Sequence, residues 1–364
     1  MKSINHIKSS LFSILFFLLT TFNGFGQNNI QIEPKPATIF IEQGNNKQII
    51  NFDFLVSNTS KDTLYLYKLS VSVFDNDNNL LQTRFLDNNG TAPSIKTLST
   101  RIWNGEETHL IFNPFSEFEI TVPIKKLQYE WTFLNNKDEE FILKSTIYPQ
   151  KYAQKNKLSF PLKGKILVYD AHDHNSHHRR FDYNFRPIKE FGISTNFMRY
   201  AYDFVILDNE NRQFKNKGET NEDYFSFGSQ IYAVDNGKVI YAANHFKDDK
   251  QFDVMKLKDN PLELYGNCIA IEHDDKSISI YGHLKENSLK VKVGDIVKVN
   301  QEIAQIGVSG SSFFPHLHFE VRTSISNTAE GLPSYFNNVL LLEGKLKRKL
   351  EPGLVETGNI IETK

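Results

Sequence analysis

The sequence predicts an all-β protein, in which an N-terminal β-sandwich precedes a C-terminal domain built on an antiparallel sheet. Apolar and polar residues alternate over short runs, and clusters of Asn, Asp, Gly and Ser separate these runs, as is typical of strands joined by turns. Aromatic residues that favour strands are abundant, with 30 Phe and 15 Tyr. Long stretches with helical periodicity are absent from the sequence.

Residues 1–26 have the features of a secretory signal peptide. Lys2 and Lys8 precede an apolar run over residues 11–19 that is too short to span a bilayer. Gly24 and Gly26 then stand at positions −3 and −1 of a cleavage site. An uncleaved membrane anchor is the alternative. We expect an exported protein, periplasmic or extracellular, with no stable membrane insertion once the signal is cleaved.

The residue pattern over 27–157 predicts a β-sandwich domain of immunoglobulin-like size. Residues 50–56 and 64–74 alternate as strands do, and turn-rich segments at 57–60 and 75–79 follow them. The region contains no cluster of residue types suited to catalysis. We therefore expect a binding or spacer role for it.

Residues 158–343 predict a second strand-rich domain, whose turns include the Asp- and Gly-containing segments 235–237 and 293–295. From residue 344 to residue 364 the chain becomes rich in Lys, Arg and Glu, and we expect a solvated, charged tail.

The composition indicates a folded protein and offers no sign of nucleic-acid binding. The formal net charge is −1, which gives no support to nucleic-acid binding. Hydrophobic residues make up 40% of the chain, so extensive disorder is not expected. Cys268 is the single cysteine, so an intrachain disulfide is impossible, and we expect it to be a small buried side chain.

The C-terminal domain contains the residue types of a metal site. Alternation along a strand would place His316, His318 and Glu320 on one face. Asp203 lies in an otherwise apolar strand, where a carboxylate needs a partner, and His283 directly follows another strand. Imidazole and carboxylate groups are the ligands of catalytic zinc sites, which keep one position open for water or substrate. Taken together, these residues indicate a metal site.

Five sequence blocks resemble the lysostaphin/LytM-like zinc metallopeptidases. The blocks are RYAYDF (199–204), GSQIYAVDNGKV (228–239), YGHL (281–284), VKVGDIV (291–297), and IGVSGSS with PHLHFE (306–312 and 315–320). The resemblance covers residues 165–325, and its ordered set of blocks is far more specific than an isolated His-x-His. It implies a twisted antiparallel sheet and Zn²⁺ bound by Asp203 and His318. It also implies that His316 and His283 assist catalysis.

The third ligand of that family is a histidine four residues before the aspartate, and Arg199 occupies this position here. The resemblance points instead to an upstream segment with adjacent histidines. We expect His178 to be the third ligand, with His177 next, because in an extended segment only one of the two would face the metal. His172 and His174 are further candidates, and a solvated loop is the alternative.

These expectations describe an exported zinc endopeptidase that acts on peptidoglycan peptides or on another peptide substrate. A second hypothesis is a catalytically inactive member of the same fold that serves as a binding or activator module, because Arg199 replaces a ligand. A third is an adhesion or carbohydrate-binding protein whose N-terminal domain sets the function. The scissile bond and the oligomeric state are left open.

Overall fold

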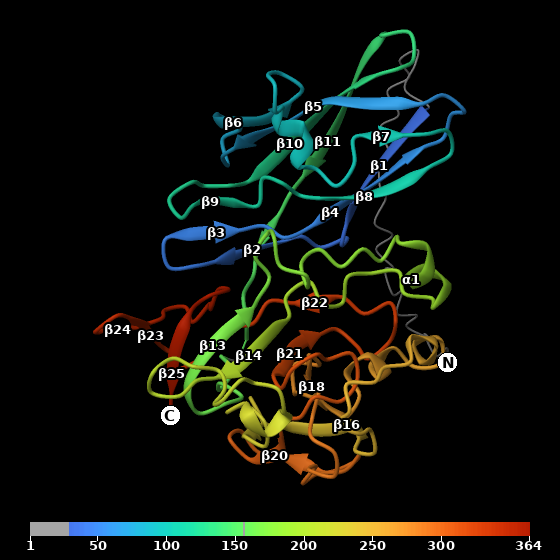
Figure 1. Cartoon of the computed structure of the whole chain (residues 1–364). Helices are drawn as coiled ribbons and strands as arrows, with labels where there is room; N and C mark the ends of the chain where they lie inside the picture. Colours follow the sequence, from blue (N-terminus) through green and yellow to red (C-terminus); the bar gives the residue numbers. More distant parts are fainter. Residues whose placement is uncertain (1–28, 156) are drawn as a thin grey trace, which may run out of the picture.

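The computed structural model describes residues 29–155 and 157–364, and within them it is built from β-sheets, which confirms the predicted all-β class (Figure 1). The predicted signal peptide lies outside the described residues. In the described part of the chain, no helix has the length and apolar character needed to cross a membrane.

The N-terminal region forms three sheets, ordered β1-β4-β8, β11-β10-β5-β6 with β7 beside β5, and β12-β2-β3-β9. The strands are β1 (Ile30–Lys35), β2 (Phe40–Gln43), β3 (Lys47–Ile49), β4 (Asp53–Asn58), β5 (Leu64–Phe74), β6 (Leu80–Asp87), β7 (Ile102–Trp103), β8 (Thr108–Phe112), β9 (Glu117–Glu119), β10 (Lys126–Leu134), β11 (Glu140–Ile147) and β12 (Gln150–Lys151), with a 3₁₀ helix η2 at Ser94–Thr97.

Aromatic side chains join two of these sheets face to face. Phe54 of β4 makes edge-on contacts with Tyr129 and Trp131 of β10, with ring centroids 4.8 and 4.9 Å apart. These rings are fully buried, as expected where large aromatic side chains fill the space between two sheets. The sandwich predicted here is therefore present, and its immunoglobulin-like character stays a prediction.

The C-terminal region is organised by one large antiparallel sheet, ordered β19-β16-β17-β18-β21-β14-β13-β25-β23-β24, with β22 beside β21 and a separate pair β15-β20. Its strands are β13 (Gly164–Asp170), β14 (Tyr202–Ile206), β15 (Gln230–Tyr232), β16 (Gly237–Ala243), β17 (Cys268–Glu272), β18 (Ile278–Gly282), β19 (Ile296–Val297), β20 (Glu302–Gln305), β21 (Leu317–Arg322), β22 (Gly331–Leu332), β23 (Leu340–Glu343), β24 (Leu346–Lys349) and β25 (Ile360–Thr363). The helices are α1 (Arg186–Glu190) and the 3₁₀ turns η3 (Asn221–Asp223), η4 (Val254–Lys258) and η5 (Pro261–Tyr265).

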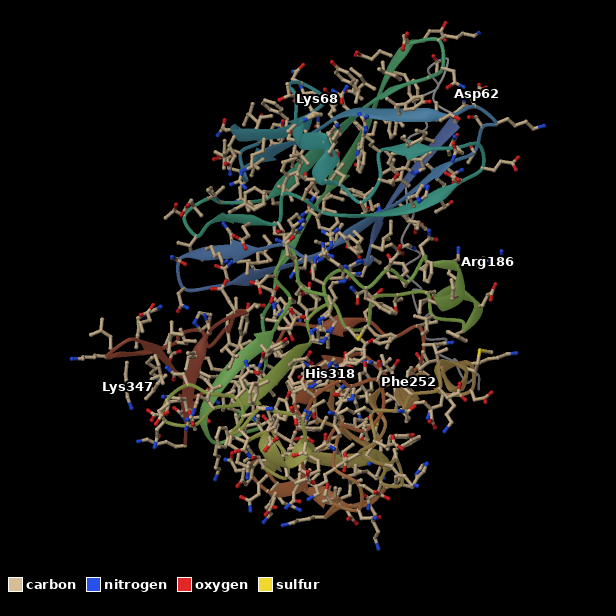
Figure 2. The ribbon with its side chains drawn as sticks, in the orientation of Figure 1. Asp62, Lys68, Arg186, Phe252, His318 and Lys347 are labelled. Carbon is tan, nitrogen blue, oxygen red and sulfur yellow. The ribbon has the colours of Figure 1, made fainter. Side chains whose placement is uncertain are left out.

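The central strand β21 is covered on both faces. Leu317, Phe319 and Val321 pack into the main core of the region. On the opposite face His318 and Glu320 are also buried, and the rings of His178 and Tyr265 pack against His318. Figure 2 shows His318 in the interior of this half of the molecule, whereas Arg186 and Lys347 lie at its periphery.

The prediction of a solvated tail from residue 344 is wrong. β24 is exposed, but β25 pairs with both β13 and β23 and so becomes an inner strand of the large sheet. Leu350, Leu354 and Ile361 are buried. The charged residues that suggested a tail are concentrated in β24, which lies exposed at the edge of the sheet.

Candidate metal centre

Asp203 and His318 lie directly opposite each other on neighbouring strands. Asp203 of β14 is in register with His318 of β21, and antiparallel partners in register bring their side chains together. His318 Nδ1 lies 3.1 Å from Asp203 Oδ1, and both side chains are buried. Two residues separated by 115 positions in the sequence therefore meet at one point.

His178 reaches the same carboxylate from the segment between β13 and α1. Its Nε2 lies 3.4 Å from Asp203 Oδ1. Donor atoms of His178, Asp203 and His318 all lie within 4.8 Å of one another, and the three residues are buried. The set combines two imidazoles with one carboxylate, which suits zinc.

His177 also faces this carboxylate, with its Nε2 3.8 Å from Asp203 Oδ2 and its ring 3.9 Å from that of His178. The expectation that only one of the two would face the site assumed an extended segment. Residues 177–180 form a turn instead, so adjacent side chains need not point to opposite sides. His177 differs from His178 in being two-thirds exposed.

His172 and His174 lie elsewhere. His172 Nε2 is 2.9 Å from the Glu42 carboxylate, in the N-terminal region, and its ring packs edge-on against Tyr200 and Tyr202. His174 interacts with the backbone of Asn113, and burial lowers its pKa. Neither residue lines the cavity around Asp203.

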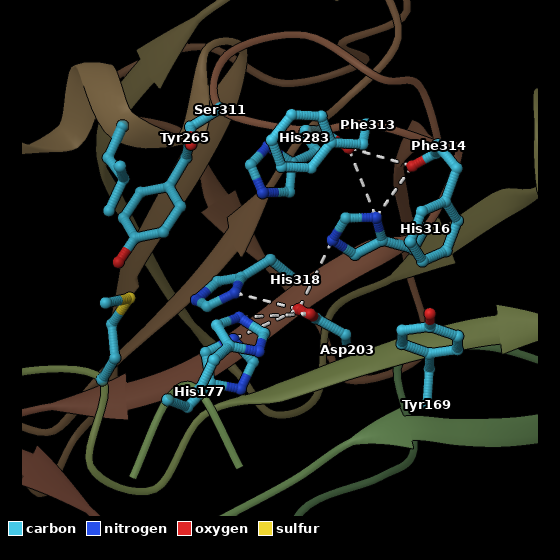
Figure 3. A pocket seen from close by; sticks show the side chains of 14 residues that line it. Tyr169, His177, Asp203, Tyr265, His283, Ser311, Phe313, Phe314, His316 and His318 are labelled. Carbon is cyan, nitrogen blue, oxygen red and sulfur yellow. Dashed lines mark hydrogen bonds and ion pairs between the residues drawn. The ribbon is translucent and has the colours of Figure 1, made fainter. Parts of the chain in front are cut away.

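His316 and His283 lie in the same cavity, and Figure 3 shows dashed lines from His316 and His318 to Asp203, whereas none joins His283 to Asp203. His316 Nε2 is 3.4 Å from Asp203 Oδ1, and its Nδ1 donates to the Phe314 carbonyl at 2.8 Å. His283 Nδ1 donates to the Ser309 carbonyl at 2.8 Å. Since a carbonyl can only accept, both rings carry a proton on Nδ1, and Nε2 is the nitrogen that faces the cavity cluster in His316.

His283 adopts a left-handed backbone conformation, with φ of 57°. Such a conformation is costly for a residue with a Cβ and is concentrated at functional sites. The backbone carbonyl of Tyr265 accepts from His283 N at 2.9 Å and holds the turn. Gly310 (φ 72°) and Gly266 pack backbone against backbone beside it, and a Cβ on Gly310 would lie 2.3 Å from Gly266 N. This close approach explains why residue 310 is a glycine.

Two carboxylates lie behind the imidazoles that face Asp203. Asp170 Oδ2 is 3.1 Å from His178 Nδ1, the nitrogen that points away from Asp203. Glu320 Oε1 lies 3.6 Å from His318 Nε2 and pairs with Arg322 at 2.5 Å. Carboxylates behind metal-ligating histidines fix the ring orientation and tautomer. The sequence analysis missed Asp170, although a carboxylate that ends an apolar strand just before four histidines was a usable signal.

The charge of Asp203 dominates the electrostatics. Burial would raise the pKa of Asp203, but His178 and His316 hold it well below its usual range. Burial alone would lower the pKa of His178. The negative charges of Asp203 and Asp170 together have the larger effect and raise this pKa to about 10. Burial, with His316 and His318, lowers the pKa of His283 well below its usual value. A field that draws protons to His178 also favours a divalent cation there.

A cavity of about 380 Å³ opens onto these residues. Its wall is largely apolar and aromatic, with Tyr169, Tyr265, Phe313 and Phe314 among the lining side chains. Phe313 is 85% exposed at the rim. A concave apolar wall with a few convergent polar groups is the usual form of a ligand-binding site.

Arg199, at the position where the resemblance implies a ligand, does not contact this cluster. Its guanidinium binds Asp53 of β4 at 2.5 Å and is fully buried. The ligand position of the family is therefore used here for an ion pair with the N-terminal region.

Comparison with known proteins agrees with this geometry. The sequence pattern described as "Peptidase family M23" matches residues 222–330. The "Lipoprotein NlpD" of Yersinia enterocolitica is 36% identical over 97 residues, which are 27% of this chain and 80% of that protein. The chain belongs to peptidase family M23. The match contains His283, His316 and His318, whereas Asp203 and His178 precede it.

Two longer relatives share the same part of the chain. The "Murein hydrolase activator NlpD" of Salmonella dublin is 35% identical over 97 residues, 27% of this chain and 21% of the relative. The "Peptidoglycan DD-endopeptidase ShyB" of Vibrio cholerae serotype O1 is 34% identical over 94 residues, 26% of this chain and 18% of the relative. The chain thus spans only about a fifth of the length of these two M23 proteins.

Proposed function

We propose that the chain is an exported zinc-dependent endopeptidase that hydrolyses peptide bonds of peptidoglycan. The observation that supports this most strongly is the convergence on one cavity of three metal-donor side chains and two further imidazoles. Membership of peptidase family M23 agrees with the chemistry of that donor set.

His178, Asp203 and His318 would hold the zinc ion. They come from three different segments and all line the cavity, and a set of three protein donors would leave one coordination position for water or substrate. When bound, zinc polarises the scissile carbonyl and makes the attacking water more acidic.

His316 is proposed to take the proton from the attacking water and to deliver it to the leaving amine. Its Nδ1 is occupied by the Phe314 carbonyl, so its Nε2, 3.4 Å from Asp203 Oδ1, is the nitrogen available to exchange a proton in the cavity. His283, whose lowered pKa keeps it neutral, orients the water and the developing tetrahedral centre from the other side of the cavity. The carbonyls of Phe314 and Ser309 fix both rings in the tautomer that this role needs.

The proposed substrate class rests on the relatives, whose names refer to murein and peptidoglycan. An extracytoplasmic location follows from the predicted signal peptide at residues 1–26. The aromatic wall beside Phe314 would contact the apolar parts of the peptide or sugar chain.

The test is zinc content together with hydrolysis of purified peptidoglycan. Asp203→Ala and His318→Ala should lose both, because each removes a donor from a three-donor set. The matched control is His245→Ala, since His245 is an exposed histidine outside the cavity. Full activity of His318→Ala would reject the assignment.

A catalytically inactive binding or activator module is the second candidate. It is favoured by Arg199 in place of a ligand and by the name of the Salmonella relative, an activator. Wild-type protein that binds no zinc and hydrolyses no peptidoglycan, but stimulates a separate murein hydrolase, would support this function instead.

A further inference from the structure

The segment that carries His178 is bound to the N-terminal region by buried charged groups. Arg179, the next residue, donates to three consecutive residues of the β3–β4 junction. Its Nε binds Asn51 Oδ1 at 3.0 Å, its Nη2 the Phe52 carbonyl at 2.6 Å, and its Nη1 Asp53 Oδ1 at 2.5 Å. The Arg179 guanidinium is thus satisfied by the N-terminal region.

Asp53 joins a second buried arginine to the same point. Arg199 Nη1 binds the other carboxylate oxygen, Oδ2, at 2.5 Å. Asp53, Arg179 and Arg199 each have no measurable exposure. A buried guanidinium without its carboxylate is strongly unfavourable, so loss of Asp53 would leave the Arg179 charge uncompensated and would leave Arg199 with Glu330 as its nearby carboxylate.

The beginning of the segment is fixed in the same way. His172 Nε2 lies 2.9 Å from the carboxylate of Glu42, on β2. Asn51 Nδ2 donates to the His172 carbonyl at 3.3 Å and to Glu42 Oε1 at 3.2 Å. Asn51 therefore contacts both ends of the stretch 172–179, and His178 lies within it.

Apolar contacts extend this attachment. Leu110 and Phe112 of β8 belong to a buried cluster with Phe197 and Met198, which lie just before Arg199. Figure 1 shows the segment between β13 and β14 lying against the N-terminal strands. The contact between the two regions is therefore a packed interior that includes the ligand-bearing segment.

We propose that the N-terminal β region is a structural part of the metal centre, in which Asn51, Asp53 and Glu42 are positioning residues that hold His178 at Asp203. The proposal rests on the proposed function, in that it takes His178 as a zinc ligand. It also accounts for Arg199: the side chain at the family's usual ligand position anchors the N-terminal region, and that anchorage presents the substitute ligand.

The test compares two buried asparagines of the N-terminal region in the full-length protein. Asn51→Leu removes the hydrogen bonds to Arg179 and His172. Asn58→Leu is the matched control, because Asn58 is also buried and its side chain bonds to Asp62, Trp103, Asn104 and Ser60, all within the N-terminal region. Zinc affinity is measured by competition with a chromophoric chelator, and thermal unfolding of the zinc-free proteins is measured in parallel.

Asn51→Leu should weaken zinc binding by up to about 10- to 100-fold, the range seen when outer partners of a metal site are lost, because its contacts hold the residues on either side of His178; Asn58→Leu should stay within about twofold of wild type. Cobalt in place of zinc should show a changed absorption spectrum in Asn51→Leu only. Equal zinc affinities in the two variants, at comparable zinc-free stability, would overturn the proposal. If Asn51→Leu does not fold, Glu42→Gln replaces it, with the same expected direction.

The outcomes separate this proposal from the proposed function. If zinc binding depends on Asn51 but the protein has no hydrolytic activity, the positioning role is supported and the peptidase function is rejected. If the protein hydrolyses peptidoglycan but Asn51→Leu leaves the zinc affinity unchanged, the peptidase function is supported and the positioning role is rejected. A wild-type protein that binds no zinc rejects both.

Discussion

Replacing Asp53 by Asn should destabilise the protein more than any surface charge substitution. The change removes one negative charge from a site where Arg179 and Arg199 each approach to 2.5 Å and all three side chains are buried. Removing one partner of a buried ion pair costs about 3–5 kcal/mol, because the remaining charge is left without compensation. Since two guanidinium groups share this carboxylate, we expect the free energy of unfolding to fall by an amount near the upper end of that range.

The assay is urea unfolding followed by tryptophan fluorescence. Both tryptophans, Trp103 and Trp131, are fully buried in the N-terminal core and report directly on that region. Glu190→Gln is the control, because it breaks the exposed pair of Glu190 with Arg186 and should cost less than about 0.5 kcal/mol. A loss below about 1 kcal/mol in Asp53→Asn would refute the assumption that the ion cluster holds the two regions together.

Other substitutions test neighbouring contacts. Arg199→His should not restore zinc to a His178→Ala protein, because the side chain at that position lies in the contact with the N-terminal strands; recovered zinc in metal analysis would contradict this. Asp170→Asn should weaken zinc affinity about 10- to 100-fold in chelator competition, and an unchanged affinity would exclude its orienting role. Burial lowers the pKa of His172, but the charge and the hydrogen bond of Glu42 together have the larger effect, so the pKa is raised overall. The ion pair therefore stabilises the folded protein fully below about pH 6.5, and this stabilisation is lost as the pH rises through the raised pKa of His172. The loss of unfolding free energy in Glu42→Gln should therefore be larger at about pH 6 than at about pH 9, and equal losses would contradict the ion pair.

The sequence was sufficient to predict the parts of the site that depend on strand geometry. Alternation placed His316, His318 and Glu320 on one face, and in the structure they line one side of the buried cluster. Asp203 stood out as a carboxylate in an apolar strand, and its neighbour across the sheet is His318. Both inferences use only local periodicity and the cost of an unpaired buried charge.

The rest depends on contacts between distant segments. The sequence does not reveal that Arg199 binds Asp53, because 146 residues separate them and neither lies in a recognisable motif for the other. The turn at His177 and His178 could not be predicted either, because its conformation is fixed by the N-terminal strands. The sequence did not predict strand β25 because it has few apolar residues, and these become buried only through pairing with β13 and β23, which are distant or weakly patterned in the sequence.

The central claim is that one zinc ion is held by His178, Asp203 and His318. A crystal structure of the zinc-loaded protein, with the ion located by anomalous scattering, tests it most directly. We predict a single ion with His178 Nε2, His318 Nδ1 and an Asp203 oxygen each at about 2.0–2.2 Å. An ion bound through His177 and Asp170 without His178 Nε2, or a zinc-saturated crystal with no ion at Asp203, would contradict the account.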